Sequence, residues 1–203
     1  MRLMSTVCAI AVAATAIAAT PDAFAQRRGQ GASVVAVNYQ RVLTESALGR
    51  DLQTKLNQVR TQIGAEAQAL APEAQSIEAE ARRLQQSLRN QSQQQVAQNA
   101  EVQALAVRQQ QLQARSQSLE GDFQCTQFIA LRDVRTQIMP IVRAIMEQRR
   151  AGIVVDSSQA LEVNADVDIT TTVIQQLDQN AATRTANVSR RPVAECQQQP
   201  PAQ

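Results

Sequence analysis

The chain has 203 residues, a formal net charge of +2, no His and an aromatic content of 2%. So mild a net charge argues against a nucleic-acid partner, because nucleic-acid binding needs a concentrated basic patch. The lack of His removes the commonest acid–base and metal-ligating side chain, and aromatic side chains usually dominate cores and binding pockets. The composition therefore disfavours a globular enzyme. It predicts a non-enzymatic protein without a cofactor, built from long helices with a thin apolar seam.

Residues 1–25 have the form of a secretory signal peptide. An apolar run from about Val7 to Ala19 follows a positive start, and Ala25 ends a small-x-small triplet of the kind that signal peptidase accepts. A membrane anchor is the alternative, and it is disfavoured because a spanning helix needs about 20 apolar residues. We therefore predict cleavage after Ala25 and a mature chain in the periplasm.

The mature chain opens with a short strand and a long helix. Residues 34–37 form a β-branched run that predicts a strand. From Leu48 to Leu88, apolar residues recur every three or four positions, which predicts one long helix. Pro72 interrupts this helix without changing the phase of the apolar positions, so we expect a kink there rather than an end.

A second long helix is predicted to return along the first. Ser92 and Gln95 fit a capping box, which marks a helix start. Apolar positions then continue as far as Ile145, with a second kink expected at Pro140. Residues 46–150 are therefore predicted to form an antiparallel helical hairpin, which we call the arm.

Short elements follow the arm. Residues 153–155 and 160–163 predict two further strands, and residues 171–178 predict a short helix behind an N-cap at Thr170. Folding back the hairpin brings all the strands together at its base. The predicted organisation is a signal peptide (1–25), a flexible leader (26–33), a β-rich oligomerisation body (34–45 and 151–179), the arm (46–150) and a disordered tail (180–203).

The predicted fold is thus mainly α with a small β body that carries a long coiled-coil arm. A body of about 50 residues is near the lower limit for a self-sufficient core, and a small sheet leaves open edges. The body is therefore expected to bury itself against copies of itself. The apolar residues predicted to form or cover its core are Val35, Val37, Ile153, Val155, Leu161, Ile174 and Leu177.

Three carboxylates in the body are candidate ligands of a calcium loop. Asp156, Asp166 and Asp168 lie close together in the sequence, but they lack the alternating ligand order and the terminal Glu of such loops. Turn and helix-cap roles are the favoured interpretation.

Two cysteines, Cys125 and Cys196, remain after the predicted cleavage. An oxidising compartment favours disulfides, and the tail is long enough to bring Cys196 from the body to Cys125 on the second helix. Pairing of Cys125 between arms and burial of a free thiol are the other options. The reduced state is slightly favoured, because a disulfide needs a Cα separation below about 7 Å and nothing in the sequence fixes the tail there.

Three arginines near the tip of the hairpin, Arg82, Arg83 and Arg89, form the one local excess of positive charge on the arm. They are candidates for contact with anionic lipid or with acidic segments of a bound protein. The alternative is a solvated face that keeps the tip soluble.

The two ends of the chain resemble the Skp/OmpH family of periplasmic chaperones. Residues 34–43 (VVAVNYQRVL) and 46–49 (SALG) resemble the family's opening. Residues 153–161 (IVVDSSQAL) resemble its strand and turn after the arm, and residues 166–170 (DVDIT) with 173–178 (VIQQLD) resemble its final helix. The resemblance covers about residues 33–178.

The resemblance implies a homotrimer whose three arms enclose a cavity. It implies an ATP-independent holdase that binds unfolded outer-membrane β-barrel proteins, with anionic lipid or lipopolysaccharide as a further partner. Two features depart from the family. The arm, residues 46–148, carries eleven Lys and Arg against ten Asp and Glu, a net charge of +1 where known members are strongly basic, and the Cys-bearing tail is extra. A structural or adaptor coiled coil of the cell envelope is the alternative function.

Overall fold

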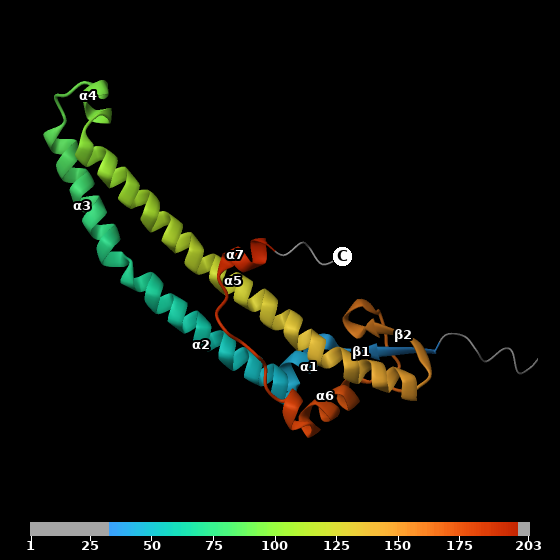
Figure 1. Cartoon of the computed structure of the whole chain (residues 1–203). Coiled ribbons are helices and arrows are strands. Elements are labelled where there is room, and N and C mark those ends of the chain that lie inside the picture. Colours follow the sequence, from blue (N-terminus) through green and yellow to red (C-terminus); the bar gives the residue numbers. More distant parts are fainter. Residues whose placement is uncertain (1–32, 199–203) are drawn as a thin grey trace, which may run out of the picture.

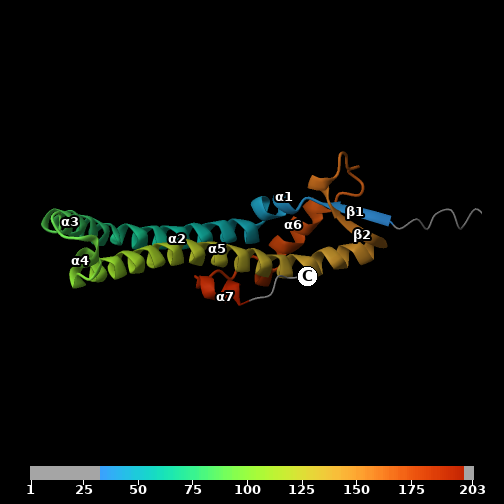
Figure 2. The same cartoon turned by 90° about the horizontal axis from the view of Figure 1, so that it is seen from above.

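The computed structural model describes residues 33–198. The predicted signal peptide, nearly all of the leader and the last five residues of the tail lie outside the described residues. The described chain is a long helical hairpin, the arm, that projects from a small body, as Figures 1 and 2 show. The predicted fold class is confirmed.

The body is organised around a parallel pair of strands, β1 (Ser33–Val37) and β2 (Ala151–Asp156). The whole arm is the crossover that parallel pairing requires. The register joins Val34 to Ile153 and Val35 to Val154. On its other side, β1 is bonded to residues 167–169: the Ala36 amide donates to the Val167 carbonyl (2.9 Å) and the Ile169 amide donates to the Ala36 carbonyl (2.8 Å).

The predicted third strand is wrong. Residues 160–163 form no strand, because the carboxylate of Asp156 accepts the Ser158 amide (2.9 Å) and turns the chain into the 3-10 helix η2 (Ser157–Gln159). Residues 167–169 instead form backbone hydrogen bonds to the free edge of β1. The Asp168 carboxylate accepts the Thr170 amide (2.8 Å) just before the next helix, so Asp156 and Asp168 both accept backbone amides in turns, in line with the favoured turn interpretation.

After β1, α1 (Tyr39–Glu45) belongs to the body, and the outgoing side of the arm consists of α2 (Ala47–Ala69) and α3 (Ala71–Ser87). Asn38 caps α1 and Ser46 caps α2, each by accepting a backbone amide. The predicted single helix is divided at Leu70, and Pro72 lies in the first turn of α3, where its missing N–H removes no helical hydrogen bond. The expectation of a kink without an end is therefore corrected: α2 ends and α3 begins within one residue.

The tip contains a short helix, α4 (Gln93–Ala97), before the returning helix α5 (Ala100–Gln148). The capping box is confirmed, since Ser92 and Gln95 each accept the other's backbone amide. It starts α4 only, and a second cap at Asn99 starts α5. Pro140 lies inside α5.

The chain ends with α6 (Thr170–Gln179), the 3-10 helix η3 (Ala181–Thr183) and α7 (Val193–Gln197). Thr170 is the first residue of α6 rather than its N-cap. The prediction of a disordered tail is corrected for residues 180–198, which run along the arm (Figure 1). We call these residues the strap.

One apolar core lies where the body meets the arm. It joins β1, α1, the start of α2, the second half of α5 and α6. Burying each large side chain there contributes roughly 1.5–3 kcal/mol. Its fully buried members include Val42, Leu48, Leu52, Val134, Ile138, Ile145, Ile169, Val173 and Leu177. Among residues 33–198, no helix is both long and apolar enough to cross a membrane.

Candidate interaction surfaces

The outer edge of β2 is an open apolar edge. Within the part of the chain that the structure describes, β2 pairs only with β1. Paired residues of a parallel ladder lie on one face, and on this face Val34 is 40% exposed, Ile153 49% and Val155 37%. Unpaired strand edges with exposed apolar residues are places where another chain can add.

The residues predicted for the oligomerisation body divide into two groups. Val35, Val37 and Leu177 are buried within the chain, and Ile174 packs against the same core. Ile153, Val155 and Leu161 lie at the surface, where Leu161 is fully exposed in the loop after η2. The single chain thus buries the inner face of the sheet. On the outer face it buries Ala36 but leaves Val34, Ile153 and Val155 partly exposed. The part that these residues play in oligomerisation stays a prediction.

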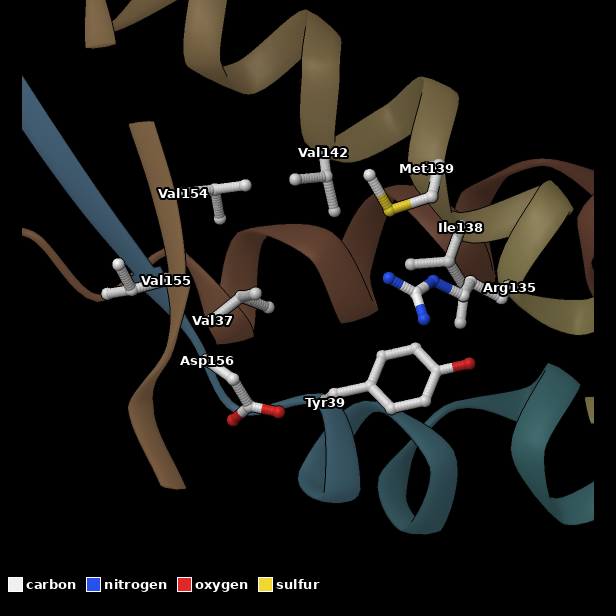
Figure 3. A pocket seen from close by; sticks show the side chains of 9 residues that line it. All are labelled: Val37, Tyr39, Arg135, Ile138, Met139, Val142, Val154, Val155 and Asp156. Atoms are coloured by element: carbon white, nitrogen blue, oxygen red, sulfur yellow. The ribbon is translucent and has the colours of Figure 1, made fainter. Parts of the chain in front are cut away.

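Beside this edge lies a cavity of about 200 Å³ between the sheet, α1 and α5 (Figure 3). Its inner wall is apolar, with Val154 directed toward Val142 of α5, and its rim holds Tyr39 and Arg135. Burial raises the pKa of the Tyr39 phenol, against the opposing effect of the Arg135 charge. The phenol therefore stays protonated at neutral pH. The cavity has room for one apolar side chain with a polar group at its rim.

The tip holds a second, shallower groove of about 750 Å³ between α3, α4 and the start of α5. Arg82 and Arg89 line it together with apolar side chains that include Leu88. Arg83 instead pairs with Glu101 across the hairpin at 3.0 Å. Two of the three predicted arginines therefore share one surface, and the third stabilises the arm.

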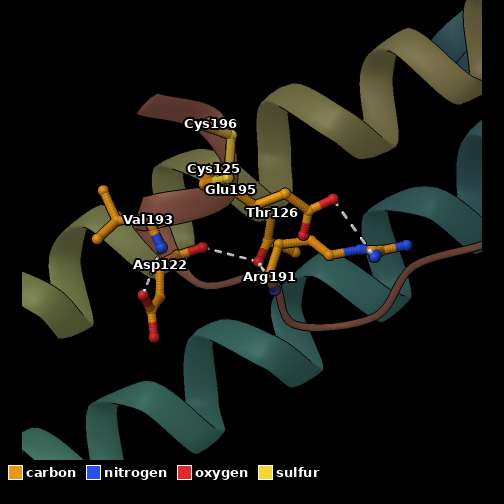
Figure 4. Close-up of a disulfide and its surroundings, with 7 residues drawn as sticks. All are labelled: Asp122, Cys125, Thr126, Arg191, Val193, Glu195 and Cys196. Atoms are coloured by element: carbon orange, nitrogen blue, oxygen red, sulfur yellow. Dashed lines mark hydrogen bonds and ion pairs between the residues drawn. A yellow bond between two sulfur atoms is a disulfide. The ribbon is translucent and has the colours of Figure 1, made fainter. Parts of the chain in front are cut away.

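The strap is covalently attached to the arm. Cys125 and Cys196 form a disulfide with a Cα separation of 5.7 Å, as Figure 4 shows. The slightly favoured reduced state is therefore wrong, and the pairing of Cys125 with Cys196 is the option that the structure contains. The reason lies in contacts that fix the tail: Asp122, 7% exposed, accepts the Val193 amide (2.8 Å), and Thr126 accepts the Arg191 amide (2.8 Å).

Sequence reasoning missed these strap-binding side chains. Asp122 and Thr126 lie one helical turn apart on α5, and the Thr126 hydroxyl also donates to the Asp122 carbonyl (2.7 Å). In the sequence they resemble ordinary polar residues of a helix. The one available signal was the cysteine pair itself, because Cys125 lies between them.

The fold is that of a small β body with a long helical hairpin inserted between its strands. The family described as "Outer membrane protein (OmpH-like)" matches residues 33–177, and the chain belongs to this family. A solved structure from Caulobacter crescentus CB15, of a protein proposed to be an outer membrane chaperone (OmpH-like), has the same fold. It is 21% identical, with a TM-score of 0.58, over 78% of this chain and 90% of that one. No curated protein matches the chain. The strap lies wholly beyond the family match.

Proposed function

We propose that this protein is an ATP-independent holdase of the periplasm. It binds unfolded outer-membrane β-barrel proteins in a cavity between helical arms and keeps them soluble for assembly. The observation that carries the proposal is membership of the OmpH-like family together with an arm whose outer half has almost no core of its own. The signal-peptide pattern of residues 1–25 supports the location.

The outer half of the arm is suited to weak, unspecific contact. In α5, no residue of the span 100–121 is buried, and Val107 is 51% exposed. Further toward the body, Phe128 is 55% exposed on the same helix. Scattered apolar side chains among Gln and Arg offer many small contacts to an unfolded chain, and several arms acting together convert weak contacts into useful affinity.

Assembly into a homotrimer would supply those arms. The open edge of β2 and the exposed side chains of Val34, Ile153 and Val155 support it, because a lone chain leaves them unpaired. Leu161 would be covered in the same way. At the tip, Arg82 and Arg89 are the proposed contacts for anionic lipid, lipopolysaccharide or acidic client segments.

The test is whether the mature protein prevents aggregation of an unfolded β-barrel protein. The barrel protein is diluted out of urea, alone or with one equivalent of the trimer, and light scattering is followed. Scattering should be suppressed at equimolar trimer, and ATP should change nothing. A rod-like coiled-coil protein of similar length is the control. Equal scattering with and without the protein would favour the alternative, a structural or adaptor coiled coil.

A further inference from the structure

The strap contacts both long helices of the arm. It leaves the body after α6, follows α2, crosses to α5 and ends in α7 at the disulfide (Figures 1 and 4). All of it lies outside the family match, so its role needs an explanation from this chain alone.

The first attachment is on α2, near the body. The Ala186 amide donates to the Asp51 carboxylate (2.8 Å), and the Lys55 ammonium donates to the Ala186 carbonyl (2.7 Å). Asp51 and Lys55 also pair with each other at 2.7 Å. Ala186 is only 3% exposed and belongs to the main core. Both backbone groups of one strap residue are therefore held by a single turn of α2.

The second attachment joins the two helices. The guanidinium of Arg190 contacts Glu66 of α2 at 2.6 Å and Asp122 of α5 at 2.9 Å. Nearby, Val193 packs so closely on α5 that a Cβ at Gly121 would come within 2.7 Å of its side chain. Arg190 thus acts as a bridge between the helices, and the disulfide at Cys125 holds the end of the strap one helical turn away.

These attachments end where the packing of the arm changes. On α5 the buried residues begin at Asp122, and on the opposite side Leu70 separates α2 from α3 soon after Glu66. A cavity of about 320 Å³ lies just beyond the strap, with Leu70 and Leu119 in its wall. The lower arm is therefore packed and crosslinked, whereas the upper arm starts at a helix break beside an open pocket.

We propose that the strap is a disulfide-locked clasp that holds α2 against α5 in the lower arm and thereby confines bending to the break at Leu70. This inference deepens the proposed function, because the position of the bend sets how far the arm tips separate around a client. A dithiol releases the clasp. One of its thiolates attacks the Cys125–Cys196 bond to give a mixed disulfide, and its second thiolate resolves it. Two cysteine thiols and an oxidised dithiol result.

Hydrogen exchange measured by mass spectrometry on the full mature protein tests the proposal. Three variants are compared with the oxidised wild type. C125S/C196S removes the lock, and Arg190→Gln removes the bridge but keeps the disulfide. Arg191→Gln is the matched control, because among residues 33–198 the guanidinium of Arg191 forms an ion pair only with Glu195 of the strap itself, at 3.5 Å.

In C125S/C196S, exchange over residues 47–66 and 122–130 should rise by about tenfold, and Arg190→Gln should raise it several-fold over the same residues. Arg191→Gln should match the wild type. Residues 74–87 and 100–118 should exchange alike in all four proteins. Adding a dithiol to the wild type should reproduce the double variant, which keeps the test valid if that variant folds poorly.

Unchanged exchange in the lower arm, or an equal rise along the whole arm, overturns the clasp. The measurement contains no client. A protein that fails the aggregation test but shows the regional pattern therefore overturns the proposed function and not the clasp.

Discussion

The open β2 edge makes a prediction about assembly that can be separated from folding of the chain. Val155 is 37% exposed in the single chain, on the outer face of the sheet. If this face is buried between copies, Val155→Asp places a carboxylate in the interface. The chain itself should tolerate the change, since the side chain already reaches the surface. The strand would lose about 1 kcal/mol through the lower β-propensity of Asp.

The cost to the assembly is much larger. Burying a Val completely contributes roughly 1.5–3 kcal/mol, so the exposed third of Val155 corresponds to about 0.5–1 kcal/mol per subunit. An unpaired carboxylate adds a desolvation cost of several kcal/mol. The substitution therefore destabilises the assembly by about 3 kcal/mol or more per subunit. Over the three subunits of a trimer, the destabilisation amounts to about 9 kcal/mol, which raises the dissociation constant by about six orders of magnitude.

Sedimentation equilibrium at micromolar concentration measures this effect, with circular dichroism as the check on arm helicity. We expect trimers for the wild type and monomers with largely retained helicity for Val155→Asp. Val107→Asp is the matched control, because Val107 is 51% exposed but lies far out on the arm. Trimers of Val155→Asp as stable as those of the wild type would refute the interface, as would equal dissociation of the control.

Three further predictions concern the arm. Leu52 is fully buried, so Leu52→Ala should lower the free energy of unfolding by about 2–5 kcal/mol in chemical denaturation. Pro72→Ala restores a backbone amide at the start of α3 and should join α2 and α3 into one helix. Hydrogen exchange around Leu70 should then become slower, and the range of client sizes that the protein accepts should become narrower. Unchanged hydrogen exchange and an unchanged range of client sizes would contradict this. Burial alone would raise the pKa of Asp51, but its hydrogen bonds from Lys55 and the Ala186 amide outweigh burial and lower it. Because the folded-state pKa is depressed, the stabilisation is complete above the ordinary Asp pKa of about 3.9 and disappears as the pH falls through the lower folded value. The stability difference between wild type and Asp51→Asn should therefore shrink below about pH 4.

The hairpin could be predicted because its helices and caps depend on residues that lie close together in the sequence. Apolar residues spaced by three or four positions define a helix from neighbouring residues alone, and the capping box at Ser92 is complete within four residues. The first residue of each helix was harder to predict from the sequence. Either Ser92 or Asn99 can cap a helix, and which cap starts the long helix depends on how the tip closes.

The errors share a different physical origin. The edge of β1 was taken by residues 167–169 rather than 160–163, a choice that depends on tertiary packing and not on β-propensity. The strap was missed because its contacts join distant residues: Arg190 and Asp122 are 68 positions apart, and the disulfide spans 71. A polar tail looks disordered until the side chains that bind its backbone are in place.

The nearly balanced charge of the upper arm agrees with the proposed holdase function. Three ion pairs cross between α3 and α5: Glu73 with Arg115 (3.0 Å), Glu80 with Arg108 (2.7 Å) and Arg83 with Glu101 (3.0 Å). All six side chains are at least 31% exposed, so each pair contributes at most about 1 kcal/mol and is screened by salt. The arginines that would make the arm strongly basic are therefore used to hold its two helices in register. Such weak crosslinks, with only Ile77 and Leu84 buried in α3, leave the upper arm less firmly packed than the lower arm, which agrees with the proposed bending above the strap.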